Sequence, residues 1–564
     1  MAPANGAEAE TLDEVQAMKN AANALLKENH LHDADAQYTK ALAALNALCE
    51  RADLRETPAE KLNEAAAVIL SNRAMTRIKL EEYGWAVNDA SEALSRCPSY
   101  YKAYYRRGCA KYAIGKYKEA LADFRAVQRL HGKDADNAAK LKDCERRVRE
   151  EAFARAIAED SAPPLSDSFS VSSLAPVEDS YTGPRLEEEG EEETEQEDGS
   201  AIVKVSREFV DALLEAFRKQ QKIHARYAAR LVLSARRMFS ALPNIVHVCV
   251  PAGREITVCG DTHGQFYDLL RIFELNGAPS RENPYVFNGD FVDRGSFSVE
   301  VILTLIAYKL MDPSCMHLTR GNHESLAMNK IYGFEGEVKA KYSETLFKLF
   351  LEMFRKLPLA YVLDGTGASS LRANELPPSR ASETAVPASH HENRDGNDGT
   401  DTGASQGATE GGKRALVVHG GLFSRDGVTL GELQRIDRDC EPDSGLMAEM
   451  LWSDPQKEPG WGASKRGVGV AFGPDVTERF LDANALQLVV RSHEMKEAGY
   501  EVEANGRLVT IFSAPNYCDQ MGNKGAWIRF GHDMVPRFTQ FEAAPHPQVK
   551  AMAYAPNLGM YGLM

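Results

Sequence analysis

The sequence predicts two folded parts, an all-helical N-terminal region and a C-terminal α/β domain. Three observations support this prediction. A pattern of small residues recurs between residues 13 and 130, short apolar runs end in glycine-containing polar clusters after residue 250, and a Pro/Ser-rich and then acidic stretch lies between them. The chain has 564 residues, 43% hydrophobic and 26% charged. This composition is ordinary for globular domains and excludes a wholly disordered or fibrous chain.

The charge is unevenly distributed. The formal net charge is −16, but nine acidic residues lie within 187–198, so the rest of the chain carries −7. Binding to nucleic acid or to an anionic membrane requires concentrated positive charge, and we expect neither. The nine cysteines are scattered without a Cys-x-x-Cys pair, which is typical of reduced intracellular thiols. Without a signal-like N-terminus or an apolar run of about 18 residues, we expect a cytoplasmic protein with no membrane span; nuclear entry stays open.

A repeat begins after residues 1–12, which we expect to be disordered. Ala86 and Ala120 are 34 residues apart, whereas Ala34 and Ala86 are 52 apart, which indicates an insertion of 18 residues. A 34-residue period is typical of tetratricopeptide repeats, whose paired helices cross closely at small residues. We predict a superhelix of three repeats over 13–160, with a capping helix at 137–159. The insertion, around 49–63, should lengthen the turn of repeat one. A generic alanine-rich helical bundle is the alternative.

The next segments predict a linker and a sheet-based domain. Residues 161–200 bury too little apolar surface to order themselves and form an acidic linker. A helical stretch over 206–242 follows, with Ser206 as N-cap. Six apolar runs then predict buried strands: EITVCGD, PYVFNGD, MHLTRGNHE, ALVVHGG, LQLVVRSHE and LVTIFSAPNY. The domain spans 201–564. Residues 364–413 interrupt it between two predicted strands, and we expect a disordered insertion at a hairpin tip.

Metal-ligand residues follow five of these strands. Asp261 and His263 are two apart, so an extended chain would point both to one side. Oxygen and nitrogen ligands without thiolate favour Mn, Fe or Zn, and a carboxylate can bridge two ions. Any one of these residues alone would be explained as a turn or core residue, but their repetition at strand ends predicts a metal site. The other candidates are Asp290, Asn322, His419 and His493.

The ordered motifs GDTHGQ (260–265), GDFVDRG (289–295), GNHE (321–324), HGG (419–421) and RSHE (491–494), with KRG (465–467) and SAPNYC (513–518), resemble the phosphoprotein phosphatase family of serine/threonine phosphatases. The resemblance implies a β-sandwich flanked by helices that holds two divalent metals, Mn or Fe/Zn. One metal would be bound by Asp261, His263 and Asp290. The other would be bound by Asp290, Asn322, His419 and His493, with Asp290 as the bridge.

The resemblance also implies a reaction. A metal-activated hydroxide would hydrolyse phosphoserine and phosphothreonine of phosphoproteins. His323 would protonate the leaving oxygen, and Asp293 would orient it. Two alternatives stay open: another metallophosphoesterase, such as a phosphodiesterase or nuclease, and a scaffold with an inactive catalytic domain. The residues implied to bind the substrate phosphate are Arg294, Asn322, Arg466 and Tyr517.

Polar residues on the first helices of the repeats predict a binding surface. Lys102 and Arg106 are four apart on one helix face, and Asn72 precedes Arg106 by one period. The resemblance implies a clamp for the acidic C-terminal tail of the ninety-kilodalton heat-shock chaperone. It also implies autoinhibition through Glu81, relieved by chaperone tails or fatty acids. Solvated helix faces are the alternative. We expect a monomer whose tail, 551–564, packs at the domain interface. The full clamp set is Lys19, Asn23, Asn72, Lys79, Lys102 and Arg106.

Overall fold

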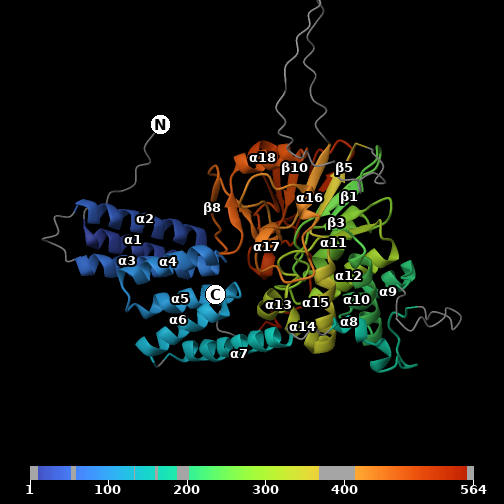
Figure 1. Cartoon of the computed structure of the whole chain (residues 1–564), viewed down its shortest axis with the longest axis horizontal. Helices are drawn as coiled ribbons and strands as arrows, with labels where there is room; N and C mark the ends of the chain where they lie inside the picture. Colours follow the sequence, from blue (N-terminus) through green and yellow to red (C-terminus); the bar gives the residue numbers. More distant parts are fainter. Residues whose placement is uncertain are drawn as a thin grey trace, which may run out of the picture.

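The computed structural model describes residues 11–51, 59–132, 134–158, 163–186, 202–366 and 413–555. Within these ranges the chain forms a helical N-terminal region that lies beside an α/β domain (Figure 1). This arrangement confirms the predicted fold class. No helix in the described ranges is long and apolar enough to cross a bilayer.

The N-terminal region consists of three helix pairs and a long capping helix. Its helices are α1 (Leu12–Lys27), α2 (Leu31–Arg51), α3 (Ala59–Lys79), α4 (Tyr83–Arg96), α5 (Tyr101–Ala113), α6 (Tyr117–Leu130) and α7 (Ala135–Ala158). Thr11 caps α1 through a reciprocal hydrogen-bond pair with Glu14. Thr11 and Leu12 therefore belong to the folded region, although they were expected in a disordered N-terminus; residues 1–10 lie outside the described ranges.

Small residues bring the paired helices close together, as the sequence predicts. Ala34, Ala86 and Ala120 are fully buried. A Cβ at Gly108 would lie only 2.8 Å from the ring of Phe124, so the helices cross where glycine has no side chain.

Most of the insertion in repeat one extends two helices, whereas the prediction placed it in the turn. Helices α2 and α3 each have 21 residues, whereas their counterparts α4 and α5 have 14 and 13. The inserted sequence is rich in Ala, Leu, Glu and Lys, residues that favour helix, and it continues both helices. Residues 52–58 lie outside the described ranges.

Two equivalent ion pairs brace the repeats. Arg73 binds Asp89 through two hydrogen bonds of 2.9 and 2.7 Å, and Arg107 binds Asp123 in the same way at 3.0 and 2.7 Å. Each pair lies 34 residues from the other, and each arginine also donates to a hydroxyl of the preceding repeat. Sequence analysis missed these pairs, although their period could have revealed them.

Part of the predicted linker is packed on the catalytic domain, which corrects its expected disorder. Residues 163–186 form α8 (Leu165–Ser168) and η1 (Val171–Ser173). Glu352 accepts the backbone N–H groups of Leu165 and Ser166 at 2.7 and 3.0 Å, and Leu186 is buried in the domain core. A few apolar side chains and these backbone contacts order a segment whose average composition indicates disorder. The acidic stretch 187–201 lies outside the described ranges.

Two stacked sheets form the centre of the C-terminal domain. The six-stranded sheet has the order β1-β5-β6-β10-β12-β11, and the five-stranded sheet has the order β14-β13-β2-β3-β4. Apolar side chains such as Val258, Val417 and Val490 fill the space between them. The strands are β1 (Ile245–Cys249), β2 (Ile256–Cys259), β3 (Tyr285–Phe287), β4 (Met316–Leu318), β5 (Ala360–Asp364), β6 (Arg414–Val418), β10 (Leu488–Arg491), β11 (Tyr500–Glu503), β12 (Leu508–Ile511), β13 (Gly525–Phe530) and β14 (Arg537–Phe541).

Helices cover both outer faces of this sandwich. On the β2–β4 side lie α9 (Arg207–Arg218), α10 (Ala225–Ser240), α12 (Ser298–Met311) and α15 (Glu344–Lys356); on the other side lie α17 (Gly445–Trp452) and α18 (Pro474–Ala483). Ser206 caps α9 as predicted, but the helix predicted over 206–242 is broken between α9 and α10. The remaining helices are α11 (Phe266–Asn276), α13 (Leu326–Tyr332), α14 (Phe334–Lys341) and α16 (Leu430–Leu433). A small third sheet contains β7 (Asp454–Pro455), β8 (Trp461–Ala463) and β9 (Val470–Phe472).

The predicted insertion leaves from a hairpin. Strands β5 and β6 pair antiparallel, and Gly365 N–H donates to the carbonyl of Lys413 at 2.8 Å. Residues 367–412 lie outside the described ranges, as do 556–564. The described part of the C-terminal tail contacts the active-site loop, where Met552 N–H donates to the carbonyl of Arg294 at 2.7 Å.

The repeat region contacts the catalytic domain through the start of α4. The N–H groups of Gly84 and Trp85 donate to the carbonyl of Lys465 at 2.7 and 3.3 Å. Tyr83 and Tyr332 share a hydrogen bond of 3.0 Å between their hydroxyls. A Cβ at Gly84 would lie 2.4 Å from the backbone of Gly467, so the two backbones meet at van der Waals distance only because residue 84 is glycine.

Candidate active site

The predicted metal ligands come together in loops that follow the strands of both sheets. Each is nearly or completely buried. They do not lie in extended chain, which corrects the geometric argument for Asp261 and His263. Strand β2 ends at Cys259, and His263 has a φ of 41°. Asp290 and His493 also have positive φ, 51° and 71°. Such conformations are strained for residues with a side chain and concentrate at functional sites.

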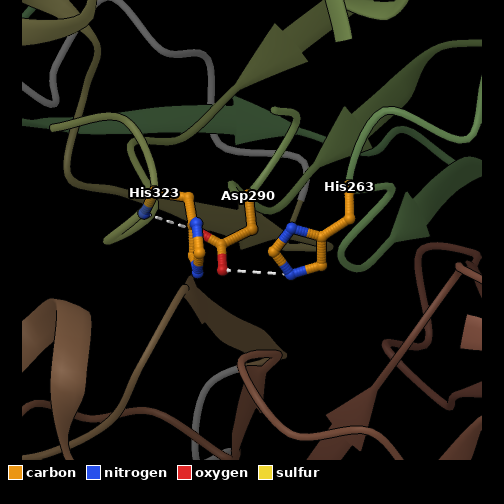
Figure 2. Close-up of side chains that lie close together, drawn as sticks. All are labelled: His263, Asp290 and His323. Carbon is orange, nitrogen blue, oxygen red and sulfur yellow. Dashed lines mark hydrogen bonds and ion pairs between the residues drawn. The ribbon is translucent and has the colours of Figure 1, made fainter. Parts of the chain in front are cut away.

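One group of side chains surrounds Asp290 on the β2 side. His263 Nε2 lies 3.5 Å from Asp290 Oδ2 and 3.7 Å from Asp261 Oδ2. Figure 2 shows His263 and His323 on either side of the Asp290 carboxylate, whose Oδ1 accepts the backbone N–H of His323 at 2.9 Å. The ligand atoms of His263, Asp290 and His323 lie within 4.8 Å of one another. The structure therefore places His323 beside His263 and Asp290 in this group.

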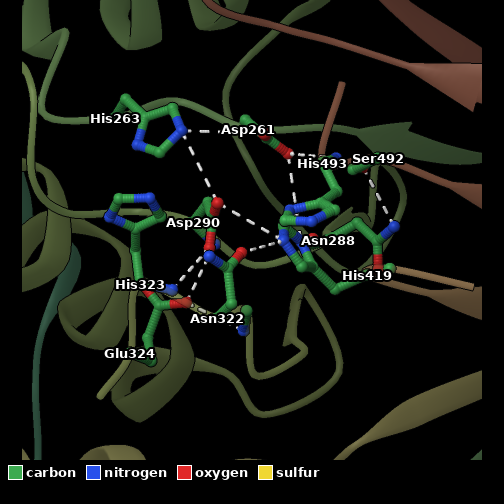
Figure 3. A network of polar contacts seen from close by, with 12 residues as sticks. Asp261, His263, Asn288, Asp290, Asn322, His323, Glu324, His419, Ser492 and His493 are labelled. Atoms are coloured by element: carbon green, nitrogen blue, oxygen red, sulfur yellow. Dashed lines mark hydrogen bonds and ion pairs between the residues drawn. The ribbon is translucent and has the colours of Figure 1, made fainter. Parts of the chain in front are cut away.

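A second group shares Asp290 (Figure 3). His419 Nε2 lies 3.3 Å from Asp290 Oδ2. One atom of the Asn322 amide lies 2.9 Å from His419 Nε2, 2.9 Å from His493 Nδ1 and 3.1 Å from Asp290 Oδ2. Asp290 thus belongs to both groups, in the place of a bridging ligand.

The chemistry of these atoms fits bound cations. His419 Nδ1 lies 2.7 Å from the carbonyl of Asn288 and donates its N–H to it, which leaves Nε2 as an acceptor. With the Asn322 amide oxygen directed at this point, acceptor atoms of Asp290, Asn322 and His419 converge, and either a cation or a flipped Asn322 amide would satisfy them. Burial raises the pKa of Asp261 to about 8 and the pKa of Asp290 to about 8, because the protein alone does not compensate these charges. Two cations would compensate them.

Two further carboxylates hold the ligand loops, and sequence analysis missed both. Glu324 accepts the backbone N–H groups of Asp290, Phe291 and Gly321 at 2.8 to 2.9 Å. Asp454 accepts Arg466 Nε at 2.7 Å and thereby holds a predicted phosphate-binding side chain in place. Glu324 is part of the GNHE motif and could have been found there, whereas nothing in the sequence marks Asp454.

The predicted acid and its partner form a hydrogen-bonded pair. His323 Nδ1 lies 2.8 Å from Asp293 Oδ2, and both side chains are buried. Burial lowers the pKa of His323 well below its ordinary value, and the nearby arginines lower it further. Nδ1 of His323 is therefore held by Asp293, and Nε2 is left free to face His263 and Asp290.

The predicted phosphate-binding arginines line one small pocket together with Glu81. Arg294 donates to Glu81 Oε2 at 2.5 Å and lies 3.8 Å above the ring of Tyr332. Arg466, Asn322 and His323 line the same pocket, whose volume of about 20 Å³ is room for roughly one water. The ring of the predicted Tyr517 lies 5.2 Å from that of His263.

Three of the predicted clamp residues are in direct contact. Asn72 donates to Asn23 Oδ1 at 3.1 Å, and Arg106 donates to Asn72 Oδ1 at 2.9 Å. The helices α1, α3 and α5 thus bring one polar side chain each to a common point. The three lysines lie on the same helices, and no hydrogen bond or ion pair of their side chains is found within the described ranges: Lys19, Lys79 and Lys102.

Comparisons with known proteins agree with this geometry. Residues 254–497 match the family described as calcineurin-like phosphoesterase, and residues 141–247 match the PPP5 TPR repeat region. The chain is 44% identical over 507 residues to serine/threonine-protein phosphatase 5 of Homo sapiens, covering 89% of each chain. The chain belongs to the serine/threonine-protein phosphatase 5 family. It is a protein serine/threonine phosphatase.

One further relative matches almost the whole chain, and a solved structure matches about three fifths of it. Serine/threonine-protein phosphatase T of Trypanosoma brucei brucei is 41% identical over 553 residues, which cover 98% of this chain and 99% of the relative. A solved phosphatase of Saccharomyces cerevisiae with similarity to human PP5 is 37% identical, with a TM-score of 0.51, and covers 62% of this chain and 100% of its own. The family therefore accounts for both regions of the molecule.

Proposed function

We propose that this phosphatase hydrolyses phosphoserine and phosphothreonine at a two-metal centre, that its repeat region holds it inactive, and that an acidic C-terminal tail of the ninety-kilodalton heat-shock chaperone recruits and activates it. The observation that carries the proposal is the pocket in which Glu81 meets Arg294 beside Asn322 and His323. A carboxylate from the repeat region there takes the position that suits a substrate phosphate.

The metal centre would use the two side-chain groups that share Asp290. Asp261, His263 and Asp290 would hold one cation, and Asn322, His419 and His493 with Asp290 would hold the other. Two divalent cations, Mn or Fe/Zn, would polarise the phosphoryl oxygens and lower the pKa of a coordinated water. The ligands are nitrogen and oxygen atoms without thiolate, which suits these metals.

The chain's own side chains would orient the phosphate and supply a proton. Arg294 and Arg466 would bind the phosphoryl oxygens through their planar guanidinium groups, and Tyr517 would add a hydrogen bond at the rim. His323, held by Asp293 at 2.8 Å, would protonate the serine or threonine oxygen as it leaves.

The closed arrangement would inhibit the enzyme by occupying this site. Glu81 binds Arg294 at 2.5 Å in this pocket and would compete with a substrate phosphate for the same guanidinium group. The apolar contacts of α3 to α7 with the catalytic domain and the backbone contacts of Gly84 would hold Glu81 in place. An acidic tail bound at Asn23, Asn72 and Arg106 would shift the population toward an open form only by binding that form better. Fatty acids would act on the same equilibrium.

The test is phosphatase activity of the full chain in Mn-containing buffer, on a phosphoserine peptide, with and without a peptide ending in Glu-Glu-Val-Asp. We expect low basal activity and activation by the tail peptide. Arg106→Ala should lose the activation and keep the basal rate. Activity on phosphodiesters greater than on the phosphopeptide would instead favour a phosphodiesterase or nuclease, and a metal-loaded enzyme without any turnover would favour a scaffold. A cytoplasmic, monomeric enzyme with phosphoprotein substrates is part of the same proposal.

A further inference from the structure

Asn329 is a buried residue of α13 that contacts both members of the His323–Asp293 pair. It lies six residues after His323 and has no solvent exposure. Its Nδ2 donates to the backbone carbonyl of His323 at 2.7 Å and to Asp293 Oδ2 at 3.0 Å. The Asn329 amide therefore joins the backbone of His323 to the carboxylate of Asp293, which the imidazole ring of His323 also contacts.

These contacts help to fix the orientation of the Asp293 carboxylate. Its Oδ2 accepts both Asn329 Nδ2 and His323 Nδ1, the latter at 2.8 Å, and its Oδ1 accepts the backbone N–H of Phe334 at 2.9 Å. Because both oxygens have donors, the carboxylate cannot rotate without losing a hydrogen bond. The carboxylate in turn orients the imidazole ring of His323 through the hydrogen bond to Nδ1.

Among the described residues, the side-chain amide of Asn329 forms hydrogen bonds only with His323 and Asp293. Its own Oδ1 is buried and has no hydrogen-bond partner in the described ranges. An unpaired buried carbonyl is destabilising, a cost that an apolar residue of similar size would not incur. The polar side chain is therefore explained by its two donor contacts and not by packing.

We propose that Asn329 is a positioning residue for proton transfer to the leaving group, acting through Asp293 and His323. This inference rests on the proposed role of His323 as the acid. If the imidazole of His323 is less well oriented, hydrolysis should slow for substrates whose leaving oxygen must be protonated. A leaving group that departs as a stable anion, such as p-nitrophenolate, needs no proton, and its hydrolysis should be nearly unaffected.

The experiment compares kcat and KM of the full-length, metal-loaded enzyme for two substrates of similar size, phenyl phosphate and p-nitrophenyl phosphate. Asn329→Leu keeps the volume and removes the donors. We expect kcat to fall about ten-fold or more for phenyl phosphate and less than about two-fold for p-nitrophenyl phosphate, with KM and bound metal unchanged. Asn329→Asp, which keeps the shape and places a second carboxyl beside Asp293, should show the same selectivity if the leucine variant does not fold.

Asn244→Leu is the matched control. Asn244 is another buried amide of this domain, and its Nδ2 donates to the carbonyls of Leu433, Gln434 and Ile436, away from the ligand loops. Its loss should affect stability without distinguishing the two substrates. Equal losses for both substrates in the Asn329 variants, or no loss, would overturn the positioning role. His323→Ala is measured in parallel: if that variant also fails to distinguish the substrates, the acid assignment itself is wrong, and the role of Asn329 falls with it.

Discussion

In the repeat region, equivalent residues make equivalent contacts: Arg73 binds Asp89 and, 34 residues later, Arg107 binds Asp123 with nearly the same distances. In the catalytic domain, each contact of the active site is made once, by loops whose backbone is strained at His263, Asp290 and His493. A repeated architecture distributes its stability over similar units, whereas a catalytic centre depends on single atoms. Substitutions should therefore have larger functional effects in the catalytic loops than in the repeats.

The largest expected effect is the loss of the acid. His323→Ala should lower turnover of a phosphoserine peptide by about 10²–10⁴-fold, the usual contribution of general acid catalysis. The variant should keep both metals, because His323 is proposed as the acid held by Asp293 and not as a ligand. Metal analysis by mass spectrometry, together with steady-state kinetics, checks this. A variant that has lost metal would show that His323 is a ligand.

Next in size is the loss of a clamp residue. Arg106→Ala removes a charged donor that already binds Asn72 at 2.9 Å. Hydrogen bonds to charged groups contribute about 1.5–3 kcal/mol, so affinity for an acidic C-terminal peptide should fall roughly ten- to hundred-fold. Titration calorimetry measures this, with Arg125→Ala on the exposed face of α6 as control. Unchanged affinity would show that the convergence of Asn23, Asn72 and Arg106 is structural only.

A smaller effect is expected where the two regions meet. Gly84→Ala should raise basal activity several-fold, because the added Cβ would lie 2.4 Å from Gly467 and hinder docking. Alanine favours helix, so α4 itself should tolerate the change. Asn88→Ala, at an exposed position of the same helix, should leave activity unchanged. If Gly84→Ala is no more active than the parent enzyme, the close approach at this point does not hold the repeat region in place.

The smallest effect concerns pH. Burial in the docked arrangement raises the pKa of Glu82 to about 7; Asp35 raises it further, and Lys465, Arg77 and Arg466 oppose the shift. The closed form therefore binds this proton more tightly than an open form would, so closure weakens as pH rises from about 4.5 to 7 and is constant above that.

The basal activity of the parent enzyme is divided by that of Glu82→Gln at each pH. Effects of pH on the active site are common to both enzymes and cancel, so the ratio reports the ionisation of Glu82. The ratio should be near one at low pH and rise as pH approaches 7. Glu92→Gln, which changes an exposed carboxyl of the same helix, should give a flat ratio. A flat ratio for Glu82→Gln as well would mean that its ionisation does not oppose docking.

Much of this molecule follows from local sequence patterns. The 34-residue period predicts the helix pairs, because the two helices of each repeat pack closely only at small residues such as Ala86 in one repeat and Ala120 in the next. The apolar runs and the flanks of the insertion predict β2 to β6, β10 and β12, whereas β1, β11, β13 and β14 were not predicted. The polar residues after five of these runs predict the ligand set. Average composition was less informative, since residues 163–186 are ordered by a few contacts with Glu352 and the domain core.

The sequence by itself determined the repeat fold, the strands that precede the ligand loops and the identity of the ligand-type residues, because these depend on periodicity and on neighbours along the chain. The family resemblance implied that Asp290 bridges two metals and that Glu81 is inhibitory. Only the tertiary structure gave the distances between these groups, showed that Asn329 joins His323 to Asp293, and placed Glu81 2.5 Å from Arg294 across 213 positions of sequence. These are contacts between atoms distant along the chain, made in loops whose conformation the surrounding core imposes, and no local pattern encodes such distances.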